Sequence, residues 1–178
     1  MSVTMSQLTV PVFVRSLTNL STLLKKGEAH ALETGMTPEA LLGARLAPDM
    51  LPLSAQVQRA SDTSKFAVQR ISAGEAPRFA DDETTFAQLQ DRIAQTIAYL
   101  ESVDAAQLDA GGERTVTVNW GKAGGDFTGL GYLLTIALPN FYFHVATAHD
   151  ILRQQGVPIG KLDYLGPFGS GPGSPTAA

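Results

Sequence analysis

Two of the three histidines in this 178-residue sequence lie in one short aromatic segment, LPNFYFHVATAHD, at residues 138–150. Imidazole rings can hold a divalent metal, relay protons or hydrogen-bond a ligand, so this segment is the first place to look for chemistry. One helix brings two ligands to one ion when they are three or four residues apart. His144 and His149 are five residues apart and point about 140° away from each other on a regular helix. The spacing therefore argues against a metal shared by these two rings.

A second pair, Asn140 and His144, has the four-residue spacing that places both side chains on one face of a helix. We expect both to point into the protein interior. An amide is a poor ligand for zinc or nickel, so the pair suits a hydrogen-bonded polar site better than a metal site. Two interpretations stay open for His144: a core histidine satisfied by a neighbouring amide, or a group that binds a ligand or takes part in catalysis.

The other candidate groups are spread over the chain. Gln56 lies close to the apolar stripe of its helix, and its amide either reaches solvent or turns toward His144. His149 is expected at the surface beside its neighbour in the sequence, and His30 at the surface or in an interface. No metal is expected; if zinc or nickel is bound, we expect His144 to hold it together with His30 or His149.

Three consecutive aromatic residues, Phe141, Tyr142 and Phe143, cover most of the circumference of the last helix. At least one is expected to face outward, and contact between two subunits of a homodimer is the simplest reason for it. The segment IGKLDYLG carries Lys161 and Asp163 and is expected either to clasp the end of the protein or to contribute to a site. The candidate ligand-binding residues are thus Asn140, His144, Gln56, Tyr142, Lys161 and Asp163.

Apolar residues recur at three- and four-residue spacing in four long stretches, which predicts four amphipathic helices and hence an all-α four-helix bundle. Asp49 is expected to cap the second helix and Asp62, further along it, to face solvent. Pro139 is expected to kink the last helix or to remove one of its backbone hydrogen bonds. The first expected helix runs from Thr9 to Thr34, with Pro11 in its first turn, and a short helix follows Thr37. The second long helix runs from near Asp49 to Gly74. The third begins at a capping box of Thr85 and Gln88, and the last runs from about Thr128 to Gln155.

The segment ERTVTVNW differs from the helical stretches, because apolar and polar residues alternate in it and place Val116, Val118 and Trp120 on one face. A glycine-rich turn and a short return strand follow, which predicts a small β-hairpin before the last helix. Residues 1–168 are expected to form a single domain. The Gly-, Pro- and Ser-rich residues 169–178 are expected to be a flexible tail.

The net charge of −4 and the absence of a basic cluster argue against a nucleic-acid partner. The chain has no cysteine, which excludes thiolate ligands and is compatible with a reducing compartment. No stretch has the ~20 apolar residues of a membrane helix, and the first ten residues lack the pattern of a signal peptide. We therefore expect a cytoplasmic protein without a membrane partner.

The segments TVPVFVRSLTNLSTLL, LAPDMLPLSAQVQRASD, ETTFAQLQDRIAQTIAYLES, LPNFYFHVATAHDILRQQGV and IGKLDYLG, taken together, resemble a bacterial family catalogued as a domain of unknown function. That family is similar to the DinB/YfiT-like superfamily, which is described as a superfamily of metalloenzymes. The resemblance covers residues 7 to 168. It implies a DinB-like four-helix bundle with up-down-down-up order, often assembled as a dimer.

In better-known branches of that superfamily, which include thiol-dependent transferases and isomerases, a metal is held by one histidine of the second helix and an HxxxH pair of the last helix. His144 matches one position of this pair, and its partner position is held by Asn140 or Ala148. Gln56 is our assignment for the position on the second helix. The resemblance thus implies a small-molecule-binding protein with a degenerate, metal-free site around His144. The alternatives are a metal-dependent hydrolase or thiol transferase, and an interaction module without chemistry.

Overall fold

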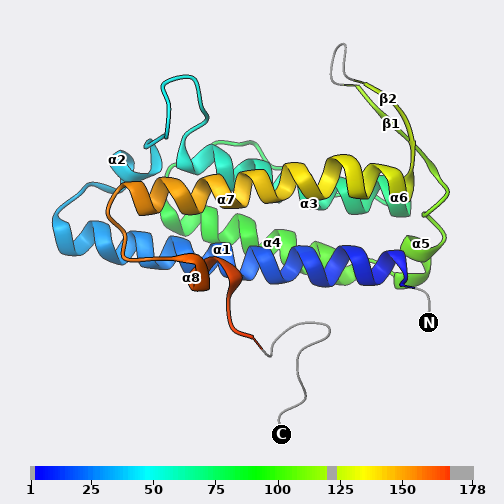
Figure 1. Ribbon diagram of the computed structural model, residues 1–178, viewed down its shortest axis with the longest axis horizontal. Coiled ribbons are helices and arrows are strands. Elements are labelled where there is room, and N and C mark those ends of the chain that lie inside the picture. Colours follow the sequence, from blue (N-terminus) through cyan, green and yellow to red (C-terminus); the bar gives the residue numbers. More distant parts are fainter. Residues whose placement is uncertain (1–2, 120–123, 169–178) are drawn as a thin grey trace, which may run out of the picture.

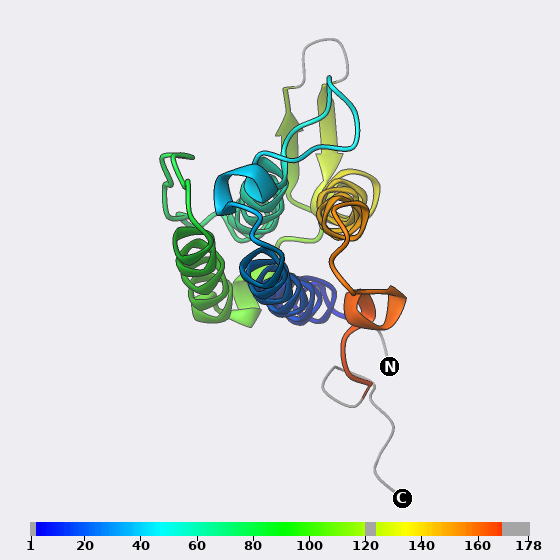
Figure 2. The same cartoon turned by 90° about the vertical axis from the view of Figure 1, so that its left-hand side faces the viewer.

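Four long helices form the body of the protein, as the apolar periodicity predicts. The computed structural model describes residues 3–119 and 124–168. Seen end-on, the four helices pack side by side around one core (Figure 2). They are α1 (Met5–Thr34), α3 (Leu53–Ser72), α4 (Phe86–Ser102) and α7 (Leu138–Gln154).

The chain runs along α1, returns along α3, repeats that direction along α4, and comes back along α7 (Figure 1). This is the up-down-down-up order of a DinB-like bundle. Because α3 and α4 are parallel and consecutive, the chain must travel back along the bundle between them. Residues 73–85, which contain neither helix nor strand, make this crossover.

The shorter elements lie at the ends of the bundle and beside α1. The short helix predicted after Thr37 is present, and the Thr37 side chain accepts a hydrogen bond from Ala40 N–H, as a cap should. No short helix was predicted after α4, but one is present. The short elements are α2 (Pro38–Leu42), α5 (Ala105–Asp109), β1 (Thr115–Val118), β2 (Gly125–Thr128), α6 (Gly129–Tyr132), a π-helical segment η2 (Leu133–Ala137) and α8 (Lys161–Leu165).

Helix α1 begins four residues earlier than the sequence predicts. Thr4 is its N-cap, and a capping box joins the Thr4 and Gln7 side chains to each other's backbone amides. Pro11 therefore lies inside the helix and not in its first turn. The prediction took Pro11 as the start signal and overlooked the stronger one, the reciprocal hydrogen bonds of the box.

The predicted N-cap of α3 was wrong by three residues and its predicted stop by one. The N-cap is Pro52, which makes no side-chain hydrogen bond, so Asp49 does not cap the helix. The Leu53 N–H is satisfied instead by Ala44 O at 2.9 Å, from the segment that follows α2. At the other end the left-handed residue is Ala73, with φ of 60°, and not Gly74.

The last helical stretch is interrupted near Pro139, as predicted. The N–H of Leu138 donates to Leu133 O, five residues back, which is a π-helical turn. Pro139, which has no amide hydrogen, occupies the first turn of α7. Because the π-turn ends before Asn140, residues further along α7 keep the regular helical spacing that separates His144 from His149.

The core is formed by the predicted apolar stripes, including Phe13, Leu17, Val57, Leu89 and Ile151. The β-hairpin is confirmed: β1 and β2 pair antiparallel, and Val116 and Val118 are buried. Trp120 and the predicted tail, residues 169–178, lie outside the described residues. Along the described chain, no helix combines the length and the apolar character needed to span a membrane.

Candidate functional site

The centre of the candidate site is a hydrogen-bonded pair between α3 and α7. His144 Nδ1 lies 2.7 Å from Gln56 Oε1. The Gln56 Nε2 donates to Leu51 O at 3.0 Å, so its amide is used at both ends. Gln56 is only 1% exposed, which excludes the interpretation in which its amide reaches solvent. The helical pattern placed Gln56 near the core, but only the structure brings it to the histidine.

The hydrogen bonds of Gln56 fix the tautomer of His144. Because the amide nitrogen of Gln56 donates to Leu51 O, its oxygen faces the ring and must accept from Nδ1–H. The other ring nitrogen, Nε2, is then a hydrogen-bond acceptor. Burial, with a smaller contribution from the charge of Arg59, lowers the pKa of His144 from 6.5 to about 4. At neutral pH the site therefore presents a neutral, oriented imidazole.

Acid should destabilise the protein through His144. Its folded pKa of about 4 lies below the ordinary 6.5, so between these values the unfolded chain binds a proton that the folded protein excludes. Stability must fall as the pH falls through this window, by about 2 kcal/mol between pH 7 and pH 5. His144→Gln, whose amide can still donate to Gln56, should lose that much less over the same range in urea denaturation. Equal pH dependence in the two proteins would contradict the assignment.

Asn140 also faces α3 but has a different partner. Its Nδ2 donates to Thr63 Oγ1 at 2.8 Å, one turn from His144 along α7 and about two turns from Gln56 along α3. The expectation that Asn140 and His144 point to the same side is confirmed, and the amide that bonds to the His144 ring is that of Gln56, not that of Asn140. Asn140 lines a hollow of about 200 Å³ between α3, η2 and α7. The remaining lining residues are Arg59, Asp62, Thr63, Phe66, Arg70, Tyr132, Ile136 and Ala137.

The other two histidines do not join this site. His149 is buried and not at the surface, so that prediction was wrong: its Nδ1 bonds to Asp150 at 2.9 Å and its Nε2 to Gly160 O at 3.3 Å. The segment around Gly160 folds over the ring, which helical position alone could not show. His30 is half-buried and lies beside Gly156.

The residues around His144 do not fit the three-histidine metal set of the superfamily. Gln56 Oε1 is occupied by His144 Nδ1–H, Asn140 is bonded to Thr63, and Ala148 has no donor atom. Within residues 3–119 and 124–168, no group of three or more His, Cys, Asp or Glu side chains could hold an ion. The metal sets that pair His144 with His30 or His149 are therefore not assembled.

Two further candidates, Lys161 and Asp163, lie in a segment that Asp163 fastens to α1. Asp163 accepts from Gly160 N–H at 2.7 Å and pairs with Lys26 of α1, whose Nζ lies 2.5 Å away. These hydrogen bonds from Lys26 and Gly160 hold the pKa of Asp163 below its usual value. Lys161 is exposed. The clasp interpretation of this segment is the one the geometry supports, because Asp163 caps α8 and ties it to α1.

Tyr142 faces outward, as at least one of the three aromatic residues had to. It is 37% exposed and Phe143 is 56% exposed, whereas Phe141 is fully buried against Phe13. Tyr142 lines a hollow beside α1 and α8 and not the one beside Asn140. It is therefore separate from the Gln56–His144 pair.

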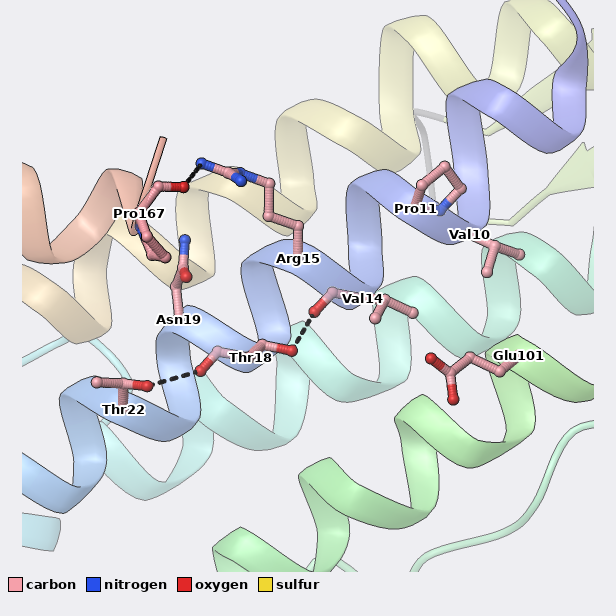
Figure 3. A pocket seen from close by; sticks show the side chains of 9 residues that line it. All are labelled: Val10, Pro11, Val14, Arg15, Thr18, Asn19, Thr22, Glu101 and Pro167. Atoms are coloured by element: carbon pink, nitrogen blue, oxygen red, sulfur yellow. Dashed lines mark hydrogen bonds between the residues drawn. The ribbon is translucent and has the colours of Figure 1, made fainter. Parts of the chain in front are cut away.

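A larger hollow, of about 520 Å³, lies on the outer side of α1 (Figure 3). Several of its polar groups are already used: Thr18 donates to Val14 O, Thr22 to Thr18 O, and Arg15 to Leu165 O and Pro167 O. Much of the remaining lining is apolar. Because these polar groups serve the protein's own backbone, size alone does not make it the better candidate site.

A group of charges around the buried Arg92 and Lys65 was not predicted from the sequence. We call it the Arg92 cluster: Arg92, Lys65, Asp62, Asp81 and Glu83. The Arg92 guanidinium donates to Asp62 and Asp81 at 2.7 Å and to Glu83 at 2.8 Å. Lys65 Nζ lies 2.8 Å from Asp62, so the prediction that Asp62 faces solvent was wrong. A signal was present, since Arg92 and Lys65 both occupy inward positions of their helices.

The Arg92 cluster ties the crossover to the bundle. Asp81 and Glu83 belong to residues 73–85, and the ring of Phe79, from the same segment, lies 4.7 Å from the Arg92 guanidinium and 4.2 Å from Lys65 Nζ. Burial disfavours the charged form of Glu83, but hydrogen bonds from Arg92 and Gln58 outweigh this and lower its pKa. The cluster thus replaces regular structure in holding this segment in place.

The order of the helices and the polar groups between α3 and α7 define the class: a DinB-like four-helix bundle. A family model described as a domain of unknown function, DUF1993, matches residues 5–165. The chain belongs to this family. A DinB family member protein from Shewanella denitrificans, known from a crystal structure, shares 38% sequence identity with this chain. The match has a TM-score of 0.86 and covers 91% of this chain and 92% of that one. None of the curated proteins matches.

Proposed function

We propose that this protein binds a small molecule between α3 and α7, at a metal-free site around His144. The observation that carries the proposal is the Gln56–His144 hydrogen bond, which holds a neutral imidazole in one tautomer. Asn140, one turn away, lines a hollow that bears both apolar and polar groups. Small-molecule sites typically combine an apolar lining with a few fixed polar groups.

Metal-dependent hydrolysis or thiol transfer is the alternative that family membership raises. It receives less support from the structure, because the groups near His144 are amides already engaged in hydrogen bonds. Metal analysis of protein purified without a histidine tag tests this directly. We expect no stoichiometric zinc or nickel; one equivalent of metal that is lost in His144→Ala would contradict the metal-free site.

Binding itself can be tested by NMR with a library of small uncharged and charged compounds. Compounds that bind should shift the side-chain amide signals of Asn140 and the ring signals of His144. Asn140→Ala should weaken these compounds about tenfold, because it removes an amide that lines the hollow. Asn19→Ala, which removes an amide near α8, is the matched control. If every compound that binds shifts only residues elsewhere, the proposed site is wrong.

A further inference from the structure

The hollow between α3 and α7 has one end suited to an anion. Arg70 and Tyr132 form this end, Phe66 and Ile136 line its middle, and Asn140 lies toward the His144 end. The order follows from the pairing of the helices, because Asn140 bonds to Thr63 while Tyr132 bonds to Arg70, about two turns further along α3.

The guanidinium of Arg70 is held in place by aromatic contacts. It lies 5.7 Å from the centre of the Phe66 ring and 5.6 Å from that of Tyr132. Its Nη1 donates to Tyr132 Oη at 2.8 Å. Arg70 is nevertheless exposed, so its remaining N–H groups are accessible. An arginine fixed in this way loses little side-chain entropy when it binds a ligand.

The two arginines of the hollow differ in their partners. Arg59 forms ion pairs with Asp62 and Asp81 at 3.3 and 3.0 Å, so its charge is already compensated. Arg70 takes part in no ion pair with any residue in the described part of the chain; its acceptor, the Tyr132 hydroxyl, is neutral. Because that hydroxyl accepts from Arg70, its own proton is available to donate. Two groups of donors therefore meet at this end of the hollow.

We infer that the ligand of this site is a small organic acid. This inference rests on the proposed function and names the chemical class of its ligand. Its carboxylate binds Arg70 and the Tyr132 hydroxyl, an arrangement in which a guanidinium can donate two parallel hydrogen bonds. Its apolar body lies against Phe66 and Ile136. Its other end reaches the Asn140 amide, the lining group that lies one helical turn from His144. The hollow, at about 200 Å³, limits the ligand to a small molecule.

The test compares benzoate with benzamide, which have the same ring and differ in charge. In NMR titrations of the full chain, benzoate should shift Asn140 and bind at least tenfold more tightly than benzamide. Arg70→Gln should remove this preference, and Tyr132→Phe should weaken benzoate several-fold while leaving the ring in place. Arg78→Gln removes the same charge from the exposed crossover and should change nothing, because Arg78 does not line the hollow.

The outcomes separate the two proposals. If benzamide binds at Asn140 as well as benzoate does, or if Arg70→Gln leaves benzoate binding unchanged, the inference about the acid is wrong and the small-molecule site stands. If uncharged compounds from the library shift the Asn140 signals while no carboxylate does, the inference about the acid is again wrong and the small-molecule site stands. If no compound of either class shifts Asn140 or His144, both proposals fail.

Discussion

Replacing Arg92 by methionine is expected to lower the free energy of unfolding by about 3–5 kcal/mol at pH 7, because acidic groups are left without their shared cation. The side chain of Arg92 is 1% exposed, and methionine fills much of its volume without its charge. Asp62 keeps Lys65 and Asp81 keeps Arg59 as ion-pair partners. Glu83 keeps the neutral Gln58 and a backbone hydrogen bond but no cation among the described residues, so it should account for much of the loss.

The matched control is Arg59→Met. Arg59 pairs with two of the same carboxylates, but its side chain is 43% exposed, so we expect a loss below about 1 kcal/mol. Urea denaturation of both variants measures the difference. Equal losses would show that burial of Arg92 does not strengthen its ion pairs, and would contradict the role given to the Arg92 cluster.

The pH dependence of Arg92→Met gives a second measurement. The folded pKa of Glu83 lies below its ordinary 4.5, so its charged form stabilises the protein above that pH, and this stabilisation is lost as the pH falls through the folded pKa. Without Arg92 the largest hydrogen-bond contribution to this stabilisation is lost. The variant should therefore be closest to the wild type at acid pH, and Glu83→Gln in the Arg92→Met background should restore part of the stability at pH 7.

Substituting Gly111 by alanine should be at least as damaging, with an expected loss of about 3 kcal/mol or more. A Cβ atom at Gly111 would lie 2.1 Å from Ile71 O and 2.8 Å from Ile71 Cγ2. The clash is with backbone at the end of α3, which cannot rotate away as a side chain can. Moving Gly111 would in turn disturb Gly129, because a Cβ there would already lie 2.1 Å from Gly111 O.

Gly27→Ala is the matched control, because Gly27 is also buried. Its added Cβ would meet Leu152 Cδ2 at 2.7 Å, the flexible end of a side chain, and alanine favours the helix in which it lies. We expect a change within about 1 kcal/mol. Thermal or urea denaturation of the two variants measures the loss of stability. A small loss in Gly111→Ala would mean that the backbone at the junction of α3, α5 and α6 shifts easily, which would contradict this prediction.

Much of the architecture could be predicted from local patterns. The inward positions of α3, such as Val57 and Ile71, follow from the 3.6-residue helical repeat and are all buried as expected. The capping box of Thr85 and Gln88 and the alternation of Val116 and Val118 also identified their elements correctly. These signals succeed because they depend on residues only a few positions apart.

The candidate site could be predicted only in part. Helical spacing placed Asn140 and His144 on one face, and it separated His149 from them. It could not assign Thr63 and Gln56 as their partners, since this depends on how α3 is rotated and shifted against α7.

By itself, then, the sequence determined which stretches are helical, which faces are apolar and which side chains of one helix share a face, because the helical repeat links each of these to local spacing. Only the tertiary structure decided that Arg92 is buried among acids, that the segment around Gly160 covers His149, and that Arg70 lies against Tyr132. Each of these contacts joins residues from separate segments. Their distances depend on helix packing, which no local pattern encodes.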